Sequence, residues 1–262
     1  MVKRRAGRWL WVVLAAAIGV GMVGSALAAE NYLGVAPPPV HGTPSVVTTC
    51  AACHGADGVA IAPTFPNLAG QNYNYLLKSL EDFRSGKWKA APMDQLVKVI
   101  PTAAGDANIE QVAAYFSRLP LKPSGAAKRK PTKAVAEAGY KLYFEGNPDA
   151  QVPACAACHI ANGMGDAPMA VPRLAGQNAA YVVSQLQAFA KGQRPSHDDV
   201  MTKIAGRLSE KDMQAVGAYV QAMHPDLLPG SVPMNFGAYE KALKGQPVPG
   251  IPASAIAKPG QR

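Results

Sequence analysis

Cys50-Ala51-Ala52-Cys53-His54 recurs without change at Cys155-Ala156-Ala157-Cys158-His159. Cys-x-x-Cys-His is the attachment sequence for c-type haem, in which two thiols add to the vinyl groups of one haem and the adjoining imidazole reaches the iron. The two copies use all four cysteines of the 262-residue chain. The sequence therefore predicts two covalently attached haem c groups, with attachment residues Cys50, Cys53, Cys155 and Cys158 and iron ligands His54 and His159.

Two other uses of a Cys-x-x-Cys pair have to be weighed against haem. The pairs could form one four-cysteine zinc site, or each pair could work as a redox dithiol. Both alternatives leave the two adjoining histidines unexplained. The zinc site would also have to join pairs that lie about a hundred residues apart, whereas zinc ribbons usually keep both pairs close.

An internal repeat divides the chain into two halves. Pro-Asn-Leu-Ala-Gly-Gln-Asn at 66–72 matches Pro-Arg-Leu-Ala-Gly-Gln-Asn at 172–178, at a constant offset of 106 residues. The repeat predicts one domain over residues 43–121 and another over residues 134–224. Each is under a hundred residues, so its core is marginal without help, and an apolar haem would supply the missing core.

Apolar residues recur at helical spacing in both halves. Stripes begin at Tyr75 and Ile109 in the first half and at Tyr181 and Met213 in the second, and a further helix is expected over 134–145. Its counterpart in the first half, around 45–49, is shortened. No stretch predicts a strand, so the expected fold class is all-α with long loops.

The segments outside the two halves have distinct compositions. Residues 1–28 combine basic residues, an uncharged apolar run and small residues before the expected cleavage point, which is typical of a signal peptide. Because the uncharged run is about long enough to span a bilayer, a retained anchor is the alternative. Residues 122–133 form a basic linker, and residues 225–262 form an extension rich in Pro and Gly. Export to the periplasm agrees with haem attachment, which takes place outside the bacterial cytoplasm.

The charge distribution excludes one class of partner. The chain carries a formal net charge of +9, but the two halves are close to neutral and the positive charge lies in the connecting segments. Nucleic-acid binding requires a basic patch on a folded face. No nucleic-acid partner is therefore expected.

The second axial ligand decides what each iron can do. Methionine raises the reduction potential, histidine gives a lower one, and an open position permits ligand binding. Met93 is the methionine that follows the motif in the first half, in a segment expected to be a loop between two helices, and Met201 holds the corresponding position in the second half. We expect both to be iron ligands, with His197 as the nearest rival. Met213 and Met223 lie on the apolar face of the expected final helix and are expected to be core residues. His41 and His224 are expected to be structural or exposed.

A histidine ligand usually donates its second ring N–H to a fixed acceptor, which orients the ring. Proline carbonyls suit this role because the proline ring fixes the local backbone. Pro66 and Pro172 lie 12 and 13 residues after their histidines and open the repeated element. We expect their carbonyls to hold His54 and His159, with a plain turn as the alternative.

The duplicated Cys-Ala-Ala-Cys-His, the repeated Pro-x-Leu-Ala-Gly-Gln-Asn and the sequence Met201–Ser209 resemble the diheme cytochromes c of the c4 type. The resemblance covers about residues 45–224. It implies two tandem class I cytochrome c domains, each wrapped around one haem, with the haems facing each other across the interface. It also implies His/Met ligation at both irons. The first half departs from the family where Asp94–Ile100 follows its methionine.

The resemblance implies a periplasmic carrier that passes single electrons between respiratory proteins, often toward a terminal oxidase. The expected partners are redox proteins: a cytochrome complex, a copper protein or an oxidase. The alternative function is the cytochrome subunit of a periplasmic dehydrogenase complex. A diheme enzyme would need an open iron or an unusual ligand, so the protein is expected to carry electrons and to catalyse no reaction of its own. Membrane association would require retention of the N-terminal segment.

Overall fold

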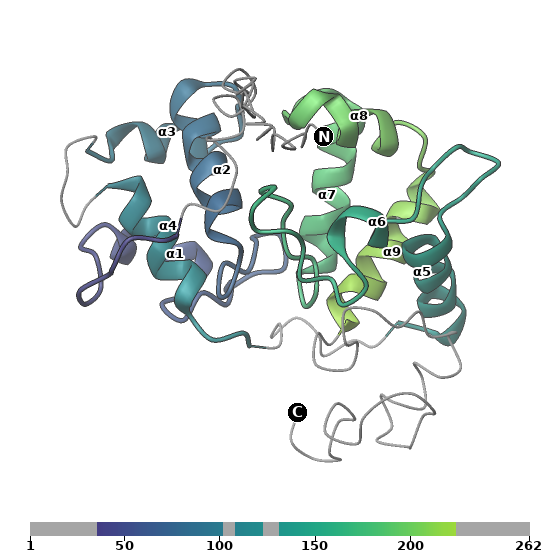
Figure 1. Cartoon of the computed structure of the whole chain (residues 1–262), viewed down its shortest axis with the longest axis horizontal. Coiled ribbons are helices and arrows are strands. Elements are labelled where there is room, and N and C mark those ends of the chain that lie inside the picture. Colours follow the sequence, from purple (N-terminus) through teal and green to yellow (C-terminus); the bar gives the residue numbers. More distant parts are fainter. Residues whose placement is uncertain (1–35, 102–107, 123–130, 224–262) are drawn as a thin grey trace, which may run out of the picture.

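The computed structural model describes residues 36–101, 108–122 and 131–223, and Figure 1 shows them as helices joined by long loops. Within these residues there is no β-strand, only isolated bridges between Asn147 and Val152 and between Asp166 and Val171. The all-α prediction is confirmed. The helices in chain order are α1 (Val47–His54), α2 (Tyr73–Ser85), α3 (Met93–Leu96), the 3-10 turn η1 (Val97–Val99), α4 (Ile109–Arg118), α5 (Lys133–Glu145), α6 (Ala156–His159), α7 (Ala179–Ala190), the 3-10 turn η3 (His197–Asp199), α8 (Val200–Ala205) and α9 (Glu210–Ala222).

The core of the first half forms where α2 packs against α4. Helix α4 begins after Asn108, whose side-chain oxygen accepts a hydrogen bond from the backbone N–H of Gln111 at 2.9 Å. That oxygen satisfies one of the N–H groups that the first helical turn leaves unpaired. The buried residues Ile109, Val112 and Phe116 then follow at spacings of three and four, which places them on one face of the helix.

In the second half, α5 and α7 both pack against α9, and α7 also contacts α8. A capping box starts α9, because Ser209 and Asp212 each accept a hydrogen bond from the other's backbone N–H at 3.1 Å. Tyr143 and Tyr219 are the largest fully buried side chains of this core, at 0% and 1% exposure.

Helices α5 and α9 cross closely because α5 carries Gly139 at the contact. A Cβ atom at this position would lie 2.2 Å from the carbonyl oxygen of Ala215 and 2.6 Å from the Cβ of Tyr219. Both atoms belong to the neighbouring helix, so only a residue without a side chain permits this approach. The second-half core therefore depends on glycine in the middle of a helix, where it is otherwise unfavourable.

The first half opens differently from the expected pattern. The sequence predicts a shortened helix around 45–49, but α1 starts at Val47 and continues through the attachment motif to His54. In the second half, the long helix α5 and the motif helix α6 are separate elements. Within the described residues, the first half thus has the single helix α1 where the second half has α5 and α6.

The signal segment 1–28, most of the basic linker and the extension 225–262 lie outside the described residues, and the predicted domain boundaries remain predictions. None of the helices within residues 36–101, 108–122 and 131–223 has the length and hydropathy to cross a bilayer.

The two halves lie side by side, with α1 to α4 in one and α5 to α9 in the other (Figure 1). Each half has its own apolar cluster: one is built from residues between Val47 and Phe116, the other from residues between Tyr140 and Met223. Hydrogen bonds join the loop after the first motif, residues 65–72, to the loop after the second, residues 164–178. The repeated element therefore forms the contact between the halves.

Gly139→Ala should lower the free energy of unfolding of the second half by about 1–3 kcal/mol, the usual cost of overpacking a well-filled core. Gly217→Ala is a matched control, because its Cβ would meet its nearest neighbour at the milder distance of 3.1 Å. Urea unfolding followed by circular dichroism measures both variants. A stabilised Gly139→Ala protein, as helix propensity alone predicts, would contradict the close crossing.

Candidate haem-binding sites

The attachment motifs end their helices next to the two cores. Helix α1 carries the first motif, and Gly55 turns the chain away at a φ of 75°. Cys50 and Cys155 pack against the apolar clusters of their own halves, while Cys158 is exposed. No disulfide joins any two of these four cysteines. The disulfide form of the dithiol alternative is therefore not the arrangement found here.

The zinc alternative is also not found. Among residues 36–101, 108–122 and 131–223, no three His, Cys, Asp or Glu side chains gather as a metal-ion site. Burial raises the pKa of the Cys50 thiol and raises that of Cys155 to about 11. Zinc binds thiolates, so burial of these two thiols, which favours their neutral form, disfavours a zinc site.

Each motif histidine donates to the predicted proline carbonyl. The distance from Nδ1 of His54 to the oxygen of Pro66 is 3.0 Å, and that from Nδ1 of His159 to the oxygen of Pro172 is 2.9 Å. A carbonyl can only accept, so the proton must sit on Nδ1. The lone pair of each ring is then on Nε2, which is the state that an iron ligand needs.

The environment also favours the neutral form of both rings. Burial lowers the pKa of His54, and the hydrogen bond to Pro66 opposes the shift. Burial likewise lowers the pKa of His159, where the positive charge of Arg194 lowers it further. Since a protonated imidazole has no lone pair for a metal, both effects favour ligation.

The two candidate methionines are placed similarly in their halves. Met93 is partly buried against the first-half cluster and begins the short helix α3, so the expectation that it lies in a loop is wrong. Pro92 precedes it, at a position where a missing N–H costs a helix nothing. Met201 is partly buried against the second-half cluster, within α8. Each methionine thus shares a core with a motif cysteine.

The rival side chains have other surroundings. Met213 and Met223 are buried in the second-half core, at 5% and 2% exposure, as their spacing predicts. His197 is exposed, and its Nδ1 lies 3.0 Å from a carboxylate oxygen of Asp198. His41 is exposed, and His224 lies outside the described residues.

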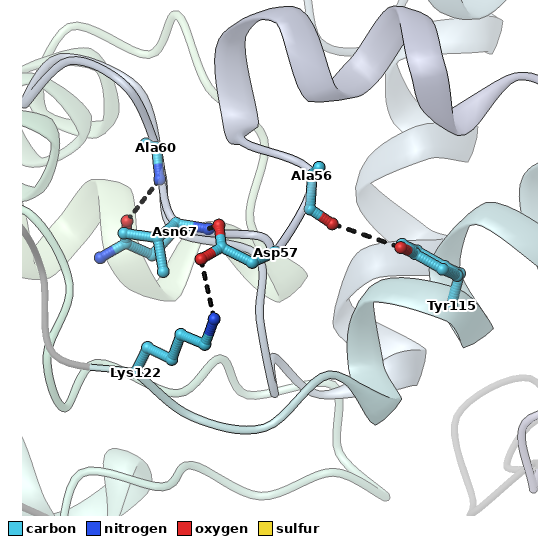
Figure 2. A network of polar contacts seen from close by, with 7 residues as sticks. Ala56, Asp57, Ala60, Asn67, Tyr115 and Lys122 are labelled. Carbon is cyan, nitrogen blue, oxygen red and sulfur yellow. Dashed lines mark hydrogen bonds and ion pairs between the residues drawn. The ribbon is translucent and has the colours of Figure 1, made fainter. Parts of the chain in front are cut away.

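The loop after the first motif is held by polar contacts (Figure 2). The side-chain oxygen of Asn67 accepts from the N–H of Ala60 at 2.9 Å, and Lys122 lies 2.9 Å from a carboxylate oxygen of Asp57. The hydrogen bond from Lys122 also lowers the pKa of Asp57. Lys122 opens the basic linker, so one of the linker charges is already paired with the first half.

A reciprocal set of hydrogen bonds joins the two repeated elements. Gln177 pairs with the backbone of Asn67: its Oε1 accepts from the N–H at 2.8 Å, and its Nε2 donates to the carbonyl at 3.0 Å. Gln71 does the same with the backbone of Arg173, at 2.7 Å and 2.9 Å. The sequence analysis missed both glutamines. Their presence in both copies of the repeat was the available signal.

Arg194 forms a second contact between the halves. Its guanidinium donates to the hydroxyl of Tyr75 at 2.6 Å and lies over the ring of Trp88, 4.2 Å from the centroid. The ring of Phe189, in its own half, is 4.4 Å away. A buried guanidinium is stabilised by the face of an aromatic ring. Sequence reasoning missed this contact because Tyr75 and Trp88 lie in the other copy of the repeat.

Arg173 provides a test of whether the site suits haem. Its guanidinium is 5% exposed and donates to the carbonyl of Ala69 at 2.8 Å, yet its Nε has no hydrogen-bond partner. Burial lowers the pKa of this side chain to about 10. A buried cation with an unused donor is stabilised by an anionic neighbour that accepts its hydrogen bond. Haem carries two propionate carboxylates, so the residues present fit this group.

Comparisons with known proteins agree with this chemistry. The family model described as Cytochrome c matches residues 42–120 and again 136–224. Cytochrome c4 of Stutzerimonas stutzeri is 40% identical over 185 residues, covering 68% of this chain and 86% of the relative. The thiosulfate dehydrogenase electron acceptor of Stutzerimonas stutzeri strain A1501 is 37% identical, covering 65% of this chain and 76% of the relative.

Among solved structures, reduced recombinant cytochrome c4 from Pseudomonas stutzeri aligns with a TM-score of 0.59 and 37% identity. The alignment covers 68% of this chain and 95% of that one. Two adjacent family matches and relatives of this identity establish two covalently bound haem c groups and a role in electron transfer. The chain belongs to the cytochrome c family, as a diheme protein of the c4 type.

Proposed function

We propose that the protein is a periplasmic carrier in which each half holds one haem c with histidine and methionine as axial ligands. Cys50 and Cys53 would attach the first haem, and Cys155 and Cys158 the second. His54 with Met93 and His159 with Met201 would complete the coordination. Bound haem supplies a one-electron couple, and these ligands favour an iron that carries electrons without taking up substrate.

The chain's own residues have three tasks in this scheme. The thiols fix the haem to a helix end, so its position does not depend on binding equilibria. The carbonyls of Pro66 and Pro172 hold each imidazole in one orientation and one tautomer. The apolar clusters beside Cys50, Met93, Cys155 and Met201 exclude water from the site, and the thioether ligands close it to small molecules.

One observation carries the proposal. The same constellation of motif cysteine, histidine, proline carbonyl and partly buried methionine occurs in both halves, and the halves meet through the loops that contain the prolines. Two equivalent redox sites joined by a buried contact are suited to passing electrons through the molecule.

The partners we propose are redox proteins: a cytochrome complex or copper protein on one side and a terminal oxidase on the other. Because the halves are nearly neutral, long-range steering by them should be weak, and contact should depend on surface complementarity.

A second candidate is the cytochrome subunit of a periplasmic dehydrogenase complex. Similarity to a protein named thiosulfate dehydrogenase electron acceptor favours it. Purification of the protein from its native cells separates the two candidates. A free carrier elutes without a partner, whereas a subunit elutes together with a larger dehydrogenase chain.

Met201→His should keep its haem attached and low-spin but lower one of the two potentials, by on the order of 0.1–0.3 V, since axial ligands set haem potentials over about 0.8 V. Imidazole is a stronger donor than thioether and favours ferric iron. A redox titration followed by absorbance measures both potentials. Met213→Leu, a change in the buried core, is the control and should move neither. An unchanged curve for Met201→His would show that this residue is not a ligand.

Replacing both Cys155 and Cys158 with Ala should leave one haem per chain, because the first half has its own site and its own core. Mass spectrometry and haem absorbance per protein count the attached groups. The reciprocal change at Cys50 and Cys53 is the matched comparison and should also leave one. Loss of both haems from either variant would mean that the halves mature only as a unit.

A further inference from the structure

One peptide group joins each motif histidine to the opposite half. The carbonyl of Pro66 and the N–H of Asn67 belong to the same peptide unit. The oxygen accepts from Nδ1 of His54 at 3.0 Å, and the N–H donates to Oε1 of Gln177 at 2.8 Å. A continuous chain of hydrogen bonds therefore runs from the imidazole of one half to a side chain of the other.

The second half repeats this arrangement. The oxygen of the Pro172–Arg173 peptide accepts from Nδ1 of His159 at 2.9 Å, and its N–H donates to Oε1 of Gln71 at 2.7 Å. Each glutamine thus acts on the histidine that lies in the other half. The two chains cross the interface in opposite directions.

The glutamine oxygens are held firmly in place. Oε1 of Gln177 accepts a second hydrogen bond from the N–H of Asn178 at 2.9 Å, while its Nε2 donates to the carbonyl of Asn67. If the amide were flipped, its NH₂ group would face the N–H groups of Asn67 and Asn178, and its oxygen would face the carbonyl of Asn67. Gln177 and Gln71 are 4% and 3% exposed, so water cannot replace the acceptor.

Hydrogen bonds in such a chain polarise one another, and the effect is larger in a poorly solvated interior. An acceptor on the N–H of Asn67 makes the carbonyl of Pro66 more negative. That carbonyl then draws the Nδ1 proton of His54 more strongly, which makes the imidazole a better donor to a metal. A better donor favours the ferric state and lowers the potential.

We propose that Gln177 is a positioning residue that lowers the potential of the first-half haem, and that Gln71 does the same for the second-half haem. The inference rests on the proposed ligand roles of His54 and His159. It makes the contact between the halves a determinant of both potentials, because separation of the halves would remove both acceptors at once.

The test is a redox titration of the haem-loaded protein followed by NMR, with the assigned ring signals of His54 and His159 reporting each haem separately. Gln177→Met keeps the length of the side chain and removes the acceptor oxygen. It should raise the ratio of ferrous to ferric haem in the first half about two- to tenfold at a fixed potential, the scale of a fractional change in one buried hydrogen bond. The ratio of ferrous to ferric haem in the second half should not change.

Two further variants separate polarisation from general loosening of the interface. Gln177→Glu restores an acceptor oxygen and should return the first-half potential to the wild-type value or below it. Asn178→Ala removes a neighbouring contact between the halves, the hydrogen bond to the carbonyl of Phe65 at 2.8 Å, and should leave both potentials in place. Gln71→Met is the mirrored change and should move only the second-half haem.

The outcomes are distinct. The inference would be overturned if Gln177→Met shifted both reduction potentials equally or shifted the potential of the second-half haem alone. It would also be overturned if Gln177→Glu shifted the first-half potential in the same direction as Gln177→Met. Unchanged potentials with an intact low-spin spectrum would overturn it as well. Loss of the low-spin spectrum would instead count against the ligand roles. If either Gln177→Met or Gln71→Met fails to fold, the other variant tests the inference.

Discussion

The carbonyl oxygens of Pro66 and Pro172 are the points on which the rest of the structure depends. Each accepts the Nδ1 proton of a motif histidine, and each belongs to a peptide whose N–H is bound by the opposite half. The same two peptide groups therefore fix the orientation of the imidazoles and the position of one half against the other. Neither can change without disturbing the other.

The small size of the halves explains why the same peptide groups bind both a histidine and the opposite half. A domain of under a hundred residues buries too little apolar surface to tolerate many unsatisfied polar groups in its loops. The loops after the motifs carry several, and each half supplies partners for the other: Gln177 for the N–H of Asn67, and Gln71 for the N–H of Arg173. Buried polar contacts of this kind stabilise little in net terms, but they specify one arrangement, because any other leaves the groups unpaired.

The sequence predicted the elements that depend on local pattern. The helical stripes at Tyr75, Ile109 and Tyr181 lie in α2, α4 and α7, and the proline carbonyls accept from the histidines at the distances given above. Two local expectations differ from the structure, since α1 continues to His54 and Met93 begins α3. The contacts that the sequence did not predict depend on facing copies of the repeat. Gln71 and Gln177 recur visibly in the sequence, but a repeat does not say that each copy binds the other. Arg194 over Trp88 has the same origin.

Asn67 and Arg173 join the halves through their backbone N–H groups, which donate to Gln177 and Gln71. Hydrogen exchange of these two amides in the diamagnetic ferrous protein, followed by NMR, tests these contacts directly. Both residues lie in loops, which usually exchange fast. The account predicts strong protection of both amides and closely similar protection factors, since one opening of the interface frees both. Fast exchange at either amide, or protection at only one, would contradict it.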